Sequence, residues 1–314
     1  MQHDLSGQLI TLFGGGGFIG RYAAQQLLAK GARLRVVQRR PEAAAFLKPL
    51  GNLGQTQFAA VDIRNAASVA RAIAGSDAVV NLVGAFADMD AVQHQGAAHI
   101  AQAAQSAGVT RLVHVSAIGA DVDSPATYGR SKGLGEQAVR AAVPNATILR
   151  PSTVFGREDQ FINRFAAMIR LAPVVPLVAP AAKFQPVYVG DFASAIAAAL
   201  GSSNAAGQTY ELGGPQTLSM EDLFRWIART IGRNPLFLPL PDAAASAMAR
   251  ATGWLPGAPL TWDQWLMLQK DTVVAPGAAT LADLDIIATA LDTVAPEWLV
   301  TFRRHGRFAM RNDH

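Results

Sequence analysis

Short apolar runs alternate with longer alanine-rich stretches through the first half of the chain. The short runs hold many β-branched residues and few charges, which is typical of strands buried on both faces. We predict strands at residues 9–13, 33–38, 57–62, 78–83, 111–116 and 146–150. The stretches between them predict helices at residues 18–30, 41–47, 66–74, 90–107 and 132–142.

This regular exchange of strand and helix predicts an α/β fold, a Rossmann doubly wound parallel sheet with helices on both faces. The rhythm breaks after Pro151, where several prolines interrupt the chain. The later elements are predicted as short strands at 186–189 and 208–212, and as helices at 191–200 and from Ser219 onward. We therefore predict a Rossmann domain over residues 1–151 and a smaller mixed C-terminal lobe over residues 152–314, interleaved with the sheet.

A glycine-rich turn follows the first predicted strand. Gly14 permits a tight turn, Gly17 lets a pyrophosphate approach the backbone, and Gly20 lets the next helix pack closely on the sheet. The amides of that helix's first turn, which includes Phe18 and Ile19, would face the phosphates. No Gly-Lys-Ser/Thr follows, so this is not the phosphate loop of nucleoside triphosphatases. The turn predicts a dinucleotide site, and the alternative is a turn that binds nothing.

The end of the second strand bears on the choice of cofactor. An acidic residue there would bind the adenosine ribose and favour NAD(H). The chain instead has Gln38, Arg39 and Arg40, and Arg21 follows the glycine turn. Guanidinium groups suit a 2′-phosphate, because they stay charged and donate two hydrogen bonds at once. We predict NADP(H) rather than NAD(H); the alternative is that these arginines are only solvated.

Further candidates stand at the carboxyl ends of later strands, where open α/β sheets bind their ligands. Asp62 and Ile63 end the third strand, and the carboxylate can accept a hydrogen bond from the adenine amine. Asn81 and Gly84 end the fourth strand beside the predicted cofactor. Pro151 ends the sixth.

Tyr128 and Lys132 follow the fifth strand, which ends at Ser116. Residues four apart share one face of a helix, so the phenol and the ammonium can meet over the nicotinamide ribose. A nearby ammonium favours the phenolate, which would let Tyr128 act as acid or base near neutral pH. We predict Tyr128, Lys132 and Ser116 as the catalytic set, with the first two also binding the cofactor.

These features together resemble the extended or atypical short-chain dehydrogenase/reductases, the epimerase/dehydratase-like group. Residues 150–165 and 183–191 are similar to a subgroup that contains the NADPH-binding accessory subunit of respiratory complex I and its bacterial relatives. The resemblance implies a tightly held and structural NADPH, a link to respiratory or quinone metabolism, and complex I or quinone-linked proteins as partners.

Other members of the family are free-standing reductases or sugar-nucleotide epimerases and dehydratases. The resemblance therefore also implies an alternative, in which Tyr128 and Lys132 carry out turnover. Ser116 is the nearest match to the family's hydroxyl residue, although Ala117 or Ile118 could occupy that place in the alignment.

Charge leaves some choices open. The formal net charge is +4. This excess fits a solvated basic surface, or attraction to phosphates, anionic lipid or an acidic partner. The basic end formed by Arg303, Arg304, Arg307 and Arg311 is either a solvated tail or a phosphate or lipid site. Arg157, Glu158 and Asp159 either line a substrate mouth or partner surface, or begin a helix.

Several classes of function are not expected. The chain has no cysteine, which excludes disulfides and thiolate chemistry, and its histidines form no metal-binding pattern. No basic run with interleaved aromatics suggests nucleic acid. No secretion signal or transmembrane run is visible. We expect a cytoplasmic protein, or one bound peripherally on the cytoplasmic face of the inner membrane.

Overall fold

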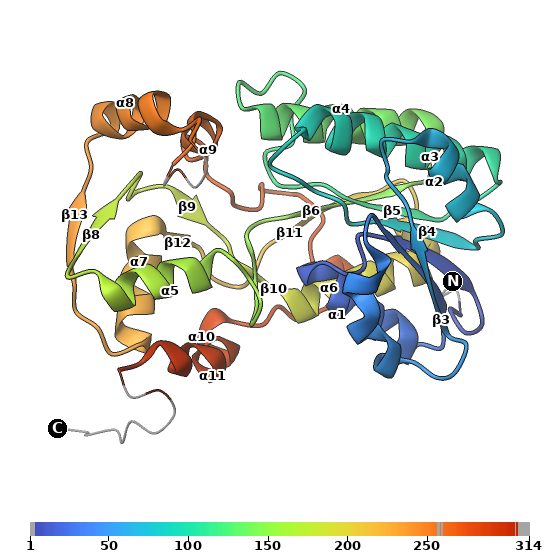
Figure 1. Ribbon diagram of the computed structural model, residues 1–314, viewed down its shortest axis with the longest axis horizontal. Coiled ribbons are helices and arrows are strands. Elements are labelled where there is room, and N and C mark those ends of the chain that lie inside the picture. The colour runs from blue at the N-terminus through green and yellow to red at the C-terminus, as the bar shows by residue number, and fades with distance from the viewer. Residues whose placement is uncertain (1–3, 256–257, 259, 305, 307–314) are drawn as a thin grey trace. The chain divides into compact units, whose positions relative to one another are not determined.

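The computed structural model describes residues 4–255, 258, 260–304 and 306, which divide into two compact units (Figure 1). Unit 1 holds the described residues of Met1–Pro151, Val189–Leu212 and Val274–Ile287. Unit 2 holds those of Ser152–Tyr188, Gly213–Val273 and Ala288–His314. Two stretches beyond Pro151 thus return to unit 1. Arg307 and Arg311 of the basic end lie outside the described residues.

Unit 1 is built on a sheet of seven strands in the order β11-β6-β5-β4-β1-β2-β3. The strands are β1 (Leu9–Phe13), β2 (Arg33–Gln38), β3 (Thr56–Ala60), β4 (Ala78–Asn81), β5 (Leu112–Val115), β6 (Thr147–Pro151) and β11 (Thr209–Leu212). All neighbouring pairs are parallel. The predicted Rossmann sheet is confirmed. Its strand order reverses between β1 and β4, which is where such sheets open a crevice for a ligand.

Helices cover both faces of this sheet (Figure 1). On one face α1 (Phe18–Ala29) packs against α6 (Val189–Gly201). On the other, α3 (Gly96–Ser106) packs between α2 (Ala66–Ile73) and α4 (Thr127–Ala142). The apolar strand residues are therefore covered from both sides, as with Ile10, Leu34 and Ile148, which are fully buried. This burial explains why the strands read as almost continuous apolar runs.

Three predicted helices differ in detail from those observed. Residues 41–50 form a 3₁₀ helix, Pro41–Leu50, in which Pro49 lacks the N–H that an α-helix interior would use. The helix predicted from residue 90 begins as a π-helix, Asp90–Gln95, before α3. The helix predicted from Lys132 begins at Thr127, so Tyr128 and Lys132 lie on one helix.

Unit 2 combines helices with three two-stranded ribbons. The helices are α5 (Ile162–Leu171), α7 (Met220–Thr230), α8 (Asp242–Thr252), α9 (Trp262–Met267), α10 (Leu291–Val294) and α11 (Pro296–Leu299). The ribbons pair β7 (Val154–Phe155) with β10 (Val187–Tyr188), β9 (Lys183–Phe184) with β12 (Leu218–Ser219), and β8 (Val174–Leu177) with β13 (Leu236–Pro239). Their core contains Phe155, Ile162, Leu223 and Leu299. Ser219 begins α7 as predicted, because its hydroxyl caps the helix by accepting from the Asp222 N–H.

Asp159 begins a helix rather than lining an open mouth. Its carboxylate accepts hydrogen bonds from the backbone N–H groups of Gly156 (3.0 Å), Phe161 (2.9 Å) and Ile162 (2.7 Å). The side chain is buried, which raises the pKa of the carboxyl group although these N–H groups oppose the rise. Asp159 therefore satisfies amides at the start of α5 that helix geometry leaves without partners.

Replacing Asp159 with Ala should lower the free energy of unfolding by about 2 kcal/mol, because buried amides lose their acceptor. Urea unfolding of both proteins, followed by circular dichroism, measures the change. Gln160→Ala is the matched control, since Gln160 is exposed beside it; it should shift stability by less than about 0.5 kcal/mol. Equal stability of the two variants would contradict the capping role.

Candidate functional site

The glycine-rich turn joins β1 to α1 at the carboxyl edge of the sheet. Gly14 has φ +79°, in the left-handed region that favours glycine. Its N–H donates to the Val37 carbonyl (3.0 Å), and the Gly17 N–H donates to the Gly14 carbonyl (3.0 Å). A Cβ on Gly20 would lie 2.4 Å from the Gly14 oxygen. Only glycine therefore lets α1 approach the turn this closely.

The start of α1 offers several backbone donors. The helix follows Gly17, which has no side chain to cap it. The first N–H of α1 that donates to a carbonyl of the helix start is that of Arg21, which donates to the Gly17 carbonyl (3.1 Å). The N–H groups of Phe18, Ile19 and Gly20 come before it and are left by helix geometry for an outside acceptor. Together with the helix dipole, they form an environment suited to a phosphate.

Gln38 holds the glycine turn against the end of β2. Its Oε1 accepts from the Gly16 N–H (3.0 Å), and its Nε2 donates to the Arg40 carbonyl (2.5 Å). A Cβ on Gly16 would lie 2.1 Å from that Oε1. The sequence marked Gln38 only as the replacement for an acid. Its bracing role needs residues 22 positions apart to meet, which no local pattern reveals.

The three predicted arginines surround the same end of β2. Arg39 and Arg40 are exposed. Arg39 is close enough to Asp62 to contribute to lowering the pKa of that carboxyl group. The Arg21 guanidinium lies over the Phe46 ring, 4.4 Å from its centroid. These cations thus sit beside the glycine turn and β3, where the adenosine half of a dinucleotide would lie in this fold.

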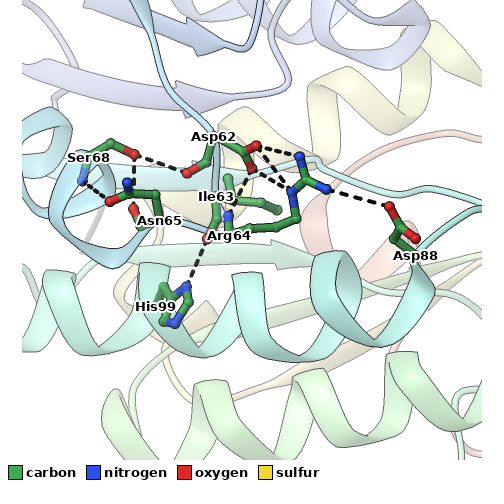
Figure 2. A network of polar contacts seen from close by, with 7 residues as sticks. All are labelled: Asp62, Ile63, Arg64, Asn65, Ser68, Asp88 and His99. Atoms are coloured by element: carbon green, nitrogen blue, oxygen red, sulfur yellow. Dashed lines mark hydrogen bonds and ion pairs between the residues drawn. The ribbon is translucent and has the colours of Figure 1, made fainter.

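Asp62 is held by an arginine that the sequence analysis did not single out (Figure 2). The Arg64 Nε donates to Asp62 Oδ1 (3.0 Å), and its Nη2 donates to Oδ2 (2.6 Å). The Arg64 side chain is the main reason why the pKa of Asp62 falls to about 2. Asp62 is therefore a carboxylate at neutral pH, with part of its acceptor capacity already used.

The same network ties the turn after β3 to its neighbours. Arg64 Nη1 lies 3.5 Å from an Asp88 carboxylate oxygen in the loop after β4. On the other side, the His99 Nδ1–H on α3 donates to the Ile63 carbonyl (2.9 Å). Figure 2 shows these contacts on both sides of the turn. Asp62 and Ile63 are thus held in place from two elements.

Asn81 turns into the sheet and binds His114 on the next strand. Its amide Nδ2 donates to His114 Nδ1 (3.0 Å), and both side chains are buried. Burial, with help from Lys132, lowers the pKa of His114 to about 3. The ring is therefore neutral, with its proton on Nε2. Asn81 and His114 are polar residues within otherwise apolar strands. A polar residue in an apolar run can therefore mark a site, and this signal could have identified His114, which we did not predict.

Lys132 and Ser116 meet at the end of β5. The Lys132 ammonium donates to the Val115 carbonyl (3.0 Å) and is buried. Ser116 follows directly, and its buried hydroxyl has no hydrogen-bond partner among the described residues. A Cβ on Gly84 would lie 3.7 Å from the Lys132 Nζ and 3.8 Å from the Gln93 Oε1. Gln93 Oε1 is also buried without a partner in the described part of the chain.

Tyr128 lies one helical turn before Lys132, beneath an aromatic ring. Phe86, from the loop after β4, stacks on it with ring centroids 5.1 Å apart and planes 16° apart. Phe86 itself is largely exposed, whereas Tyr128 is partly buried.

Pro151, the remaining candidate, ends β6, where its carbonyl accepts from the Ile118 N–H (3.0 Å).

Burial governs the protonation of the Tyr128–Lys132 pair. It raises the pKa of Tyr128 to about 12 and lowers the pKa of Lys132 to about 8, the latter against an opposing effect of Glu136. Burial therefore opposes the phenolate that Lys132 is expected to favour. Loss of hydration is the cause of the raised pKa of Tyr128.

These observations fit a nicotinamide dinucleotide. The glycine turn leaves room and donors for a pyrophosphate. The unpartnered Ser116 hydroxyl and Gln93 carbonyl, near the Lys132 ammonium, can bind hydroxyl and amide groups of the nicotinamide half. Comparison with known proteins agrees: residues 10–213 match the model of the NAD dependent epimerase/dehydratase family. The chain belongs to this family.

Two relatives show which members of the epimerase/dehydratase family this chain is similar to. Both are named NADH dehydrogenase (ubiquinone) 1 alpha subcomplex subunit 9, mitochondrial. The Arabidopsis thaliana protein is 35% identical, covering 96% of this chain and 80% of that protein. The Rattus norvegicus protein is 36% identical, covering 96% and 81%. The predicted resemblance to the complex I subgroup is confirmed.

A solved structure shows the same fold. Triphenylmethane reductase of Citrobacter sp., complexed with NADP(H), matches with a TM-score of 0.74 and 18% identity, over 92% of this chain and 99% of that one. Family membership supports binding of a nicotinamide dinucleotide, and the geometry of the glycine turn agrees with it.

We expect the Tyr128 phenol to ionise with a pKa of about 12 rather than the usual ~10, because desolvation penalises the phenolate. Near-ultraviolet titration of the wild-type protein minus Tyr128→Phe isolates this one phenol. In Phe86→Ala the midpoint should fall toward ~10 as water reaches the ring. A wild-type midpoint near ~10 would refute the effect of burial.

Proposed function

We propose that this protein is an NADP(H)-binding accessory subunit of a respiratory complex I-type assembly, in which the nucleotide is a structural ligand. The observation that carries the proposal is a glycine turn with helix amides left for a pyrophosphate, beside a Tyr–Lys pair in which burial raises the pKa of the phenol far above neutral pH. The likeness to the two complex I subunits supports the assembly. A bound nicotinamide nucleotide would supply a hydride donor or acceptor.

Each part of the site has an assigned task in this proposal. Gly14, Gly17 and the amides of Phe18 and Ile19 hold the pyrophosphate, with Gly20 allowing the helix to approach. Arg21, Arg39 and Arg40 hold the 2′-phosphate of NADP(H), while Asp62 and Ile63 border the adenine. Asn81, Gly84, Ser116, Tyr128, Lys132 and Pro151 form the nicotinamide end.

The alternative is a free-standing reductase or a sugar-nucleotide epimerase or dehydratase. The Tyr128–Lys132 pair on α4 is the feature that favours it. The raised pKa of Tyr128 counts against it, because a pKa of about 12 lies far from the neutral pH at which acid–base catalysis is most efficient. The Arabidopsis thaliana and Rattus norvegicus relatives, both above 30% identity, also favour the accessory role.

No described helix has the length and apolar character needed to cross a membrane. If the protein serves complex I, its place is at the membrane as a peripheral subunit, on the cytoplasmic face of the inner membrane. Quinone-linked proteins remain the expected partners in that setting.

The tagged full chain, purified from its own cells, should carry about one NADP(H) and bring complex I subunits with it. Native mass spectrometry, with identification of the released nucleotide, measures occupancy. Gly17→Ala places a methyl group where the pyrophosphate approaches, and it should weaken nucleotide binding at least ~tenfold. A protein that carries no nicotinamide nucleotide and no respiratory subunit would refute the proposal.

Arg39→Ala/Arg40→Ala should weaken NADPH binding by about tenfold or more and leave NADH binding nearly unchanged, because only NADPH has the 2′-phosphate. Isothermal titration of nucleotide-free protein with each nucleotide measures the two affinities. Arg71→Ala is the control, as Arg71 is exposed on α2 away from the cradle. Equal losses for NADH and NADPH would show that these arginines do not select the cofactor.

A further inference from the structure

The β8–β13 ribbon of unit 2 has one apolar face that the unit does not cover. Val174 lies opposite Leu236, and Pro176 lies opposite Leu238. All four are exposed, whereas Val175 and Leu177, on the other side of β8, are buried. We call these four residues the ribbon face. Leu236 is 65% exposed, and Leu171 just before β8 is 82% exposed. Contiguous exposed apolar residues of this kind mark an interaction surface.

The edges of the ribbon are less suited to binding than its face. Pro176 and Pro239 lie within β8 and β13 and have no N–H to donate to an added strand. A partner that extends the ribbon by β-pairing is therefore disfavoured. The occupant must instead cover apolar side chains that stand out from the sheet.

Positive charge gathers at one end of the ribbon face. β8 and β13 are parallel, so both strands start at the same end, where the Leu236 N–H donates to the Pro173 carbonyl (2.9 Å). Arg170 precedes β8, and Arg229 precedes β13; both are exposed. Arg303 joins them, because its Nε donates to the Thr230 carbonyl at the end of α7 (3.1 Å).

The segments that build this region contain no negative charge. Neither residues 160–190 nor residues 223–241 contain Asp or Glu, and together they carry six Lys and Arg residues. One of the six, Arg225, is neutralised by Glu221 on its own helix (2.6 Å). Two copies of the chain meeting through this face would bring like charges together. An apolar surface with anionic groups at its border fits it better.

We propose that the ribbon face binds an anionic lipid bilayer, with its leucines among the acyl chains and Arg170, Arg229 and Arg303 at the lipid phosphates. Leucine side chains partition into the acyl boundary, and long arginine side chains reach back to the head groups. The inference deepens the peripheral location proposed above. It rests on unit 2 alone, so its failure would leave the nucleotide site untouched.

Co-sedimentation of the full chain with phosphatidylcholine vesicles, with and without phosphatidylglycerol, tests this. The wild type should bind the phosphatidylglycerol vesicles more tightly, and salt should weaken that binding. Leu236→Ser/Leu238→Ser should weaken binding about tenfold, because the inserted apolar area is lost. Arg170→Gln/Arg229→Gln should weaken it about fivefold for each arginine on the anionic vesicles only.

Matched controls lie in unit 1. Leu53→Ser/Ile287→Ser changes two fully exposed apolar residues, and Arg33→Gln/Arg71→Gln changes two exposed arginines. Both should bind like the wild type, and every variant should retain its nucleotide. The proposal is overturned if phosphatidylglycerol does not increase binding, or if the controls lose as much as the ribbon variants. The proposal is also overturned if the ribbon variants still bind vesicles but no longer bind a purified acidic protein, because the face would then be that protein's binding site.

Discussion

The close approach of α1 to the turn that precedes it is the constraint on which the nucleotide site depends. Gly20 can have no side chain, because any Cβ would meet the Gly14 carbonyl at 2.4 Å. This contact aims the start of α1 along the carboxyl edge of β1, next to the point where strand order reverses. Gln38 then fixes the outer side of the same turn through Gly16. A strand, a helix start and one neutral side chain thus make a rigid place for an anion.

Burial is the second physical theme, and it links the site's geometry to its chemistry. His114 lies on β5, and Tyr128 and Lys132 lie on α4; for all three the loss of water is the main cause of the pKa shift. Each shift favours the neutral form. The shift moves the pKa of Tyr128 away from neutral pH, where acid–base catalysis is most efficient. This supports the proposal that the nucleotide stabilises an assembly rather than turning over.

Unit 2 differs from unit 1 in that its sheets are too small to be covered on both faces. Its small ribbons cannot bury both of their faces, so one side of β8 and β13 packs on the core while the other stays exposed. Asp159 secures the start of α5, the helix that leads into β8. Unit 2 therefore has a helix start stabilised by a buried carboxylate and one exposed apolar surface, the ribbon face, bordered by arginines. The properties of that surface do not depend on the chemistry of the nucleotide site.

The sequence alone determined the parallel sheet, the glycine turn and the spacing of Tyr128 and Lys132, because each depends on a local pattern: apolar runs, glycine spacing, or residues four apart. It also indicated the family through motifs that lie together in the chain. Only the tertiary structure decided that Arg64 reaches Asp88, that Gln38 braces Gly16, and that Phe86 covers Tyr128. It also decided the protonation of Tyr128, which depends on the exclusion of water. Such contacts and such burial arise when distant segments pack together, and no short stretch of sequence encodes them.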